Sequence, residues 1–252
     1  VNKYDKMKGS YLGPSFLKNE IKKSFDECGA IYHELSDKNI IDKTAKLLSD
    51  EKAIGWMQGR MEFGPRALGG RSIIADPRSP FMQKQLNLKV KYRESFRPFA
   101  PSVLHEEVSN WFDLDVKSPY MLLVSEVNKD KQKLLTKEES EKFGIDKLNI
   151  PKSLIPAVTH VDYSARVQTV HKNTNPKYYN LIKRFFEITG CPVLVNTSFN
   201  VRGEPIICTP YDAFKCFMGC ELDYLIVENF LLVKEEQKSS LKKNYIQSYE
   251  LD

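Results

Sequence analysis

Residues 60–72, with the sequence RMEFGPRALGGRS, constrain this chain more than any other segment. They place three arginines, a serine and three glycines in a short stretch that we predict to be mostly loop. Arginine carries a planar fork of donors that matches phosphate and carboxylate oxygens, and glycine lets a backbone approach a ligand closely. The apolar run at residues 53–58 predicts a buried strand that would hold this loop on a rigid base. The combination favours a site for a phosphorylated small molecule; the alternative is a surface turn whose arginines make salt bridges.

A second basic run, KVKYRESFRPFAP, follows at residues 89–101. Between residues 60 and 97 there are six arginines and three lysines but only three acidic residues, so the local charge is strongly positive. Such clustering beside glycines favours an anion site. Aromatic residues between the basic ones leave two further interpretations open, a nucleic-acid surface on which bases stack and a structural segment whose rings belong to the core. Binding of a small-molecule phosphate is the favoured interpretation.

Two further polar segments carry side chains of the kinds found in binding and catalytic sites. Residues 196–205 (NTSFNVRGEP) follow a predicted strand, where α/β sheets often bind ligands, but Asn, Thr and Ser also satisfy their own backbone in turns. Both interpretations stay open for that segment. In HVDYSAR at residues 160–166, His160, Asp162 and Ser164 lie within five residues, whereas hydrolase triads assemble from distant segments. We therefore do not expect a hydrolase triad.

Composition excludes several classes. The 252 residues suffice for one large domain or two small ones, and 41% hydrophobic and 11% aromatic residues indicate a folded chain. No apolar run approaches the roughly 18 residues of a membrane span, and the N-terminus shows no signal peptide. A net charge of +5 does not by itself indicate nucleic acid. Five cysteines without a C-x-x-C pattern predict a reduced, cytoplasmic protein, and no zinc or other metal site is expected.

Periodicity and capping residues predict alternating strands and helices, hence an α/β or mixed α+β fold. Residues 1–35 are expected to be irregular, 128–150 to be an exposed insertion, and the tail from residue 234 to be polar and frayed. The predicted helices are 37–50, 80–88, 177–189 and 210–219, and the predicted strands are 53–58, 120–127, 166–170, 191–195 and 223–233.

Five motifs occur in order along the chain. They are GRMEFGPRALG at 59–69, RSIIADPR at 71–78, RESFRPFAP at 93–101, ARVQTV at 165–170 and VNTSFN at 195–200. Over about residues 50–235 this series resembles the C-terminal region of the O-carbamoyltransferases, the family of nodulation-factor, cephamycin and tobramycin carbamoylation. The resemblance implies a YrdC-like twisted mixed sheet flanked by helices.

It also implies a domain plan. Residues 1–35 would connect to a missing N-terminal transfer domain, residues 36–235 would form the YrdC-like domain, and residues 236–252 a polar tail. The expected activity is the formation of carbamoyl adenylate from ATP, with Mg²⁺, and carbamoyl phosphate. The N-terminal domain, which would hold iron or another metal, would then move the carbamoyl group to a hydroxylated acceptor such as a sugar. A homodimer is plausible by resemblance, whereas membrane and nucleic acid are not expected partners.

The resemblance assigns roles to the polar residues of the motifs. The expected catalytic residues are Arg66, Lys91, Arg93 and Arg97. The expected substrate- and nucleotide-binding residues are Arg60, Glu62, Gly64, Arg71, Ser72, Arg166, Asn196, Thr197, Ser198 and Asn200. Two residues depart from the family pattern: Gly70 stands where Asn is usual, and Tyr163 where Gly is usual. The alternatives are a nucleotide- or nucleic-acid-binding module without catalysis and a regulatory piece of a larger enzyme.

Overall fold

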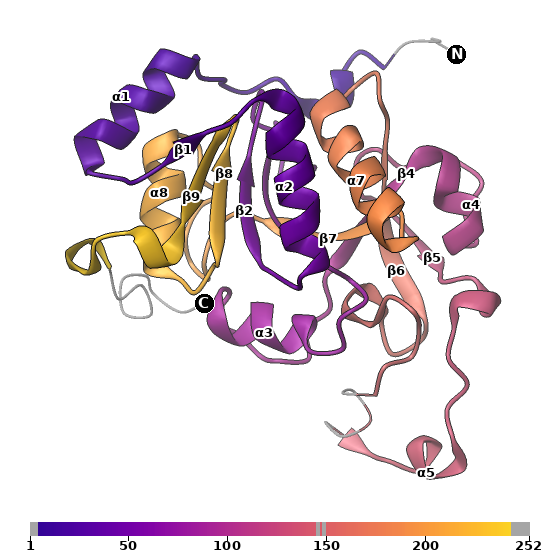
Figure 1. The fold of residues 1–252 in the computed structure, drawn as a ribbon. Helices are drawn as coiled ribbons and strands as arrows, with labels where there is room; N and C mark the ends of the chain where they lie inside the picture. The colour runs from indigo at the N-terminus through magenta and orange to yellow at the C-terminus, as the bar shows by residue number, and fades with distance from the viewer. Residues whose placement is uncertain (1–4, 145–146, 148–149, 243–252) are drawn as a thin grey trace.

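A mixed β-sheet of nine strands runs through the computed structural model, which describes residues 5–144, 147 and 150–242 (Figure 1). In spatial order the strands are β1 (His33–Glu34), β9 (Phe230–Val233), β8 (Tyr224–Val227), β2 (Ile54–Met57), β3 (Arg71–Ala75), β7 (Val193–Ser198), β4 (Ala100–Leu104), β6 (Ser164–Val170) and β5 (Leu123–Glu126). The pairs β2–β8 and β4–β6 are parallel, and the other neighbours are antiparallel. The prediction of a mixed sheet flanked by helices is confirmed.

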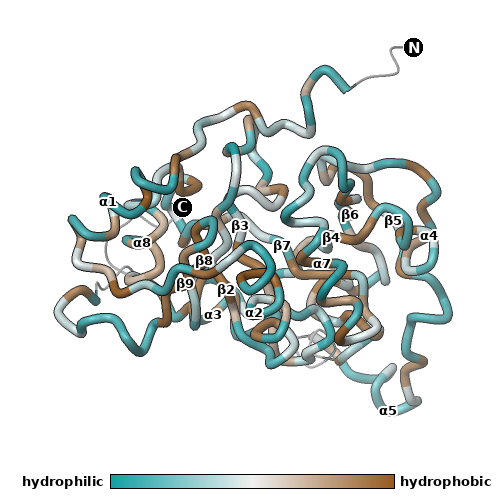
Figure 2. Tube along the Cα trace, turned by 45° about the horizontal axis from the view of Figure 1, so that its top comes forward, coloured by the Kyte–Doolittle hydropathy of each residue, from teal (hydrophilic) through white to brown (hydrophobic). Residues whose placement is uncertain are grey.

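Four of the described helices lie against this sheet in two pairs. The described α-helices are α1 (Lys18–Cys28), α2 (Asp37–Ser49), α3 (Met82–Lys89), α4 (Val108–Trp111), α5 (Lys137–Ser140), α7 (Pro176–Thr189) and α8 (Pro210–Gly219). Figure 1 shows α2 and α7 together over the central strands, and α1 and α8 together beside β8 and β9. Figure 2 shows hydrophobic residues gathered along the central strands and alternating with hydrophilic ones along the helices. The sheet core is therefore shielded by amphipathic helices.

Capping residues explain where the long helices begin. Ser36 accepts a hydrogen bond from the Asn39 amide at the start of α2, and Asn175 accepts one from the Tyr178 amide at the start of α7. Gly190, with φ 71°, ends α7 in the left-handed conformation that favours glycine. These two helices were predicted within one or two residues. The helix predicted from residue 80 begins instead at Met82, because Ser79 makes no capping bond to it.

The strand register brings the sequence motifs together. Ser72 of β3 lies opposite Ser198 of β7, and Ala100 of β4 lies opposite Asn196 of β7. Strand β6, which carries Arg166, lies on the other side of β4. Motifs that are about a hundred residues apart in sequence thus meet on neighbouring strands.

Four predictions about chain ends and loops can be compared with the structure. The expectation that residues 1–35 are irregular is wrong, because Ile21 and Phe25 bury the apolar side of α1 in the core. The loop predicted at residues 60–72 already enters β3 at Arg71. The described part of residues 128–150 is mostly exposed, as predicted, and its Leu134 is 99% exposed. The tail is attached where it begins, since Gln237 and Ile31 exchange two hydrogen bonds. Residues 243–252 of the predicted tail lie outside the described residues, and the domain limits at 35 and 235 stay predictions.

Candidate anion-binding site

A cavity of about 170 Å³ lies where the motifs meet. The arginine loop, the segment before β4, the first half of β6 and the end of β7 all contribute to its wall. The lining residues are Pro65, Arg66, Ala67, Arg93, Pro98, Phe99, Ala100, Met121, Arg166, Asn196, Thr197 and Ser198. Six of these were predicted from the sequence: Arg66, Arg93, Arg166, Asn196, Thr197 and Ser198.

Three enclosed polar atoms around this cavity lack a protein partner. They are Nε of Arg66, Nε of Arg166 and Oδ1 of Asn196. Buried polar groups in folded proteins are almost always hydrogen-bonded, so such a group points to a ligand or to function. Two cationic donors and one amide acceptor around one small cavity form a set that a bound molecule could satisfy together.

The cavity is electropositive. No acidic side chain is among the described residues that line it, whereas three arginines are. Burial lowers the pKa of Arg166, and the nearby charge of Arg66 lowers it further. Burial, followed by the charge of Arg97, also lowers the pKa of Arg93 to about 10. Like charges held together in a partly desolvated cavity favour an anion between them.

An amide network fixes the orientation of Asn196. Its Nδ2 donates to the Ala67 carbonyl at 3.1 Å and to Oε1 of Gln168 at 2.8 Å, which leaves Oδ1 as the free acceptor. Gln168 in turn donates to the Leu68 carbonyl at 2.8 Å and accepts from the Ser102 hydroxyl. Sequence reasoning missed Gln168 and Ser102. The available signal was the polar residue at position 168 inside a predicted strand, where a buried side chain must find partners.

Lys91 lies beside the cavity and is 4% exposed. Its Nζ donates to the Ser198 and Asn200 carbonyls and to Oδ1 of Asn200 at 2.8 Å. Burial, and secondarily the charge of Arg93, lowers the pKa of Lys91 to about 7. The predicted residues Lys91, Ser198 and Asn200 therefore form one cluster, and its charge changes near neutral pH.

Arg71 does not face the cavity. It is 0% exposed, and its guanidinium donates five hydrogen bonds of 2.9–3.3 Å to backbone carbonyls. The acceptors are Pro14, Gln58, Gly59, Gly70 and Cys208. The side chain thus ties four chain segments together, and its assignment to a phosphate stays a prediction.

Glu62 also acts inside the loop. Its Oε1 accepts the backbone amides of Leu68 at 2.6 Å, Gly70 at 2.7 Å and Arg71 at 3.3 Å. Oγ of Ser72 accepts from the Gly69 amide at 3.0 Å, and its assignment to a ligand stays a prediction. A carboxylate that gathers several amides folds a loop tightly around itself. Glu62 and Ser72 therefore shape the turn that presents Arg66, and neither lines the cavity.

Three other predicted residues lie outside the cavity lining. Arg60 is exposed and donates to the Leu12 carbonyl at 3.0 Å. Gly64 is exposed with φ 140°. The Arg97 side chain is 60% exposed and lies 4.0 Å from the Glu94 carboxylate. Their assignment to substrate stays a prediction.

Comparison with protein families shows to which family this chain belongs. The family described as "Carbamoyltransferase C-terminus" matches residues 45–234, which include the whole cavity lining. The chain belongs to this family. The expected resemblance is thereby confirmed.

Curated proteins similar to this carbamoyltransferase C-terminal chain are longer. The uncharacterized protein sll1178 of Synechocystis sp. is 56% identical over 255 residues, which cover 100% of this chain and 42% of that protein. Nodulation protein NolNO of Sinorhizobium fredii is 42% identical over 199 residues, covering 78% of this chain and 26% of that protein. The solved structure of full-length HypF in the phosphate- and nucleotide-bound form covers 92% of this chain and 30% of its own, with 18% identity and a TM-score of 0.47. That similarity is too weak to establish fold or function.

The two departures from the family pattern have different structural consequences. A Cβ at Gly70 would lie 2.9 Å from the Arg60 carbonyl oxygen and 3.1 Å from the Glu62 carboxylate, so a side chain there requires the backbone at Arg60 to shift and the Glu62 carboxylate to give way slightly. Tyr163 has φ 65°, in the left-handed region that glycine adopts without strain. The glycine that the family pattern has at this position is therefore explained by the turn before β6.

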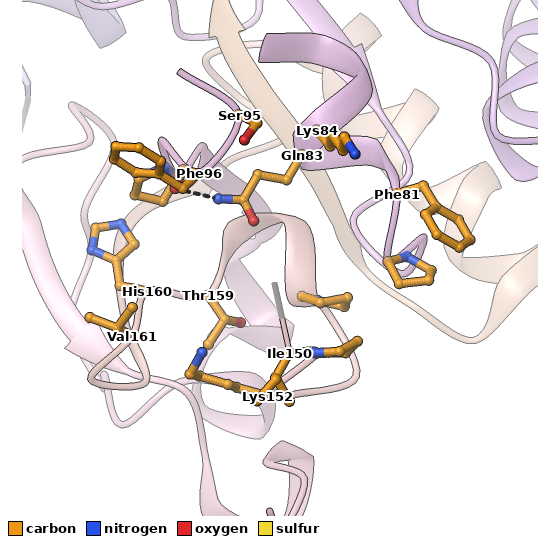
Figure 3. Close-up of a pocket in the computed structure, with 14 residues that line it drawn as sticks. Phe81, Gln83, Lys84, Ser95, Phe96, Ile150, Lys152, Thr159, His160 and Val161 are labelled. Carbon is orange, nitrogen blue, oxygen red and sulfur yellow. Dashed lines mark hydrogen bonds between the residues drawn. The ribbon is translucent and has the colours of Figure 1, made fainter. Parts of the chain in front are cut away.

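A second, larger cavity of about 670 Å³ shares one described lining residue, Pro98, with the first. Figure 3 shows this larger cavity. Phe96 and His160 lie on one side of it and Phe81 on the other in this view, and Gln83 donates to the Phe96 carbonyl at 2.7 Å. Its remaining lining includes prolines, aliphatic residues and two lysines, Lys84 and Lys152. The described lining contains no acidic residue, so this cavity also suits an anionic ligand with an apolar part.

In the described residues, no helix is long and apolar enough to cross a membrane. No group of three or more His, Cys, Asp or Glu side chains within the same residues is placed to hold a metal ion.

Proposed function

We propose that this chain binds MgATP and carbamoyl phosphate and forms carbamoyl adenylate, which serves O-carbamoylation of a hydroxylated acceptor such as a sugar. The observation that carries the proposal is the set of three partnerless polar atoms around the small cavity, namely Nε of Arg66, Nε of Arg166 and Oδ1 of Asn196. Membership of the carbamoyltransferase C-terminal family gives the reaction class.

The cavity suits carbamoyl phosphate better than inorganic phosphate. The two guanidinium donors match phosphoryl oxygens, and the Asn196 acceptor matches an amide N–H, which carbamoyl phosphate has and phosphate lacks. Because Ala67 and Gln168 occupy the amide nitrogen of Asn196, its oxygen is held in one fixed orientation as the atom left without a partner. Discrimination follows from the cost of leaving that acceptor unpaired.

The nucleotide needs more space than about 170 Å³. We place its adenosine in the larger cavity of about 670 Å³, where Phe96 and Phe81 offer aromatic faces, and its phosphates toward Arg93, which lines the small cavity. Pockets for such ligands typically measure about 300–1,000 Å³ and combine apolar walls with a few polar groups. The phosphates and the carbamoyl group would then meet beside Pro98, which lines both cavities.

The chemistry requires charge stabilisation rather than a protein nucleophile. Water takes the phosphoryl group of carbamoyl phosphate, giving phosphate and carbamate; a carbamate oxygen then attacks the α-phosphorus of ATP, and pyrophosphate leaves with Mg²⁺. Negative charge grows on phosphoryl oxygens in both steps, so fixed cationic donors lower the barrier. Arg66, Arg93 and Arg166 supply these donors, and Lys91 supplies a charge that depends on pH.

Pyrophosphate release tests the proposal. Purified chain is incubated with ATP, Mg²⁺ and carbamoyl phosphate, each omitted in turn, beside Arg66→Ala and the surface control Arg184→Ala, whose guanidinium pairs with Asp42 and Glu187. We expect release that requires all three components and is lost in Arg66→Ala alone. ATP binding without release would favour a regulatory or nucleotide-binding module. Retention on a polyanion that ATP does not displace would favour nucleic acid as the ligand.

A further inference from the structure

Residues 10–14 form a strap across the arginine loop, although they lie outside residues 45–234, which match the family. The Phe63 amide donates to the Ser10 carbonyl, and the Ser10 hydroxyl donates to the Phe63 carbonyl, both at 2.7 Å. Further along, the Gly13 amide donates to the Met61 carbonyl and the Met61 amide to the Pro14 carbonyl, both at 2.9 Å. The strap therefore follows residues 61–63 as an added strand would.

Tyr11 connects the strap to the arginine loop. Its hydroxyl donates to the Leu68 carbonyl at 2.6 Å and accepts from Nδ2 of Asn175 at 2.9 Å. Burial raises the pKa of Tyr11, so the hydroxyl keeps its proton and remains a donor across the physiological pH range. The Leu68 carbonyl thus accepts from two directions, from Tyr11 and from Gln168.

The Tyr11 ring supports the cavity wall as well. It packs with Tyr120 against a small apolar cluster of Leu68, Ala100 and Met121. Two members of that cluster, Ala100 and Met121, line the anion cavity. One side chain of the strap therefore contacts both the loop that presents Arg66 and the wall that faces it.

We propose that Tyr11 is a positioning residue for the anion cavity: its hydroxyl, held by Asn175, fixes the Leu68 carbonyl and with it the turn that directs Arg66 inward. This inference rests on the proposed function for the identity of the anion, and on the contacts above for the geometry. The site would then depend on a segment outside the part that matches the family, so a binding partner or modification that displaced residues 10–14 would weaken the site without touching it.

Binding of carbamoyl phosphate to the full chain, measured by calorimetry, is the first test. Tyr11→Phe removes only the hydroxyl. Tyr32→Phe is the matched control, because the exposed hydroxyl of Tyr32 donates to Asp26 over 2.6 Å and makes no contact with the described cavity lining. We expect Tyr11→Phe to weaken affinity about tenfold, the effect of one lost hydrogen bond that orients a charge, and Tyr32→Phe to leave it unchanged. A merely structural role would lower the midpoint of unfolding while leaving the affinity of the folded protein as it was, and that result would overturn the inference.

Hydrogen exchange gives a readout that needs no ligand. The amides of Leu68, Gly70 and Arg71 are bonded to Glu62, so a looser turn should exchange faster in Tyr11→Phe than in Tyr32→Phe. If wild type neither bound carbamoyl phosphate nor released pyrophosphate, the proposed function would fail, yet exchange would still decide the positioning role. Equal exchange rates at these three amides would overturn it.

A second variant approaches the strap differently. A Cβ at Gly13 would lie 2.9 Å from the Met61 carbonyl oxygen, so Gly13→Ala must push the strap from the loop. We expect it to weaken affinity as Tyr11→Phe does, and the double variant to lose less than the product of the two effects, because both act through one contact. If the loss of affinity in the double variant equalled the product of the two single losses, the two substitutions would act independently, which would contradict the inference that both act through the strap.

Discussion

Arg66, in the arginine loop, and Arg71, five residues later at the start of β3, use the same guanidinium in opposite ways. Arg71 is fully buried and donates to five backbone carbonyls. Arg66 lines the cavity, and its buried Nε has no protein partner. The difference lies in the backbone around each side chain, since carbonyls converge on Arg71 but not on Arg66. In an arginine-rich loop, the hydrogen-bond partners of each arginine must therefore be known before that arginine is assigned to a ligand.

Replacing Arg71 should give the largest effect. Arg71→Met keeps much of the side-chain volume but removes a donor from five carbonyls, of which only those of Pro14 and Gly70 keep a backbone amide donor among the bonds described, so we expect the free energy of unfolding to fall by about 3–5 kcal/mol. Urea unfolding measures it. Arg184→Met, which removes only exposed ion pairs, should cost at most about 1 kcal/mol. A fully stable Arg71→Met protein that no longer bound anions would reverse the comparison.

Replacing Arg66 should separate binding from stability. Arg66→Ala removes a donor that has no protein partner at Nε, so carbamoyl phosphate affinity should fall on the order of 10²-fold while unfolding changes by less than about 1 kcal/mol. Calorimetric binding and urea unfolding on the same protein give both values. Arg97→Ala should lose less affinity, because that side chain is exposed outside the cavity. Equal losses would place Arg97 in the site after all.

Lys91, a buried cation of the same region, should make the stability of the protein depend on pH. Its pKa is lowered to about 7 in the folded chain and returns toward about 10.4 on unfolding. Between these values the unfolded chain binds a proton that the folded chain lacks, so stability rises with pH, by at most about 1.4 kcal/mol per unit. From pH 7 to 8.5 we expect wild type to gain stability relative to Lys91→Met. Lys234, whose pKa is lowered to about 8, contributes equally to both proteins and cancels. Parallel pH curves for the two proteins would show that Lys91 stays charged.

Much of the fold was predictable because local signals agreed with it. The caps at Ser36 and Asn175 and the apolar side of α7 fixed two helices, and short apolar runs fixed β2 and β7. Strand β3 was missed because it begins at Arg71, a charged residue that only the surrounding carbonyls make tolerable in the core. Helix α1 was missed because only two of its residues, Ile21 and Phe25, are buried.

The site was predictable in part for a related reason. Residue chemistry and the family motifs named Arg66, Arg166 and Asn196, which do meet at the cavity. They could not separate these from Arg71 and Glu62, whose roles depend on backbone atoms that composition does not show. Nor could they find Tyr11 or Gln168, because both act on a carbonyl of a distant loop.

The smallest expected effect concerns the turn that leads into β6, three residues before Arg166. Tyr163 holds φ 65° there, a conformation that costs a residue with a side chain about 1–2 kcal/mol and glycine nothing, while glycine loses more entropy on folding. Tyr163→Gly should therefore stabilise the protein by about 0.5–1 kcal/mol, and Tyr163→Ala, which keeps the strained backbone, should not. Urea unfolding of the pair decides this. Carbamoyl phosphate affinity should stay unchanged in Tyr163→Gly, since Tyr163 does not line the anion cavity. A gain in affinity would instead mean that the strained turn displaces Arg166 and that this departure from the family pattern weakens the site.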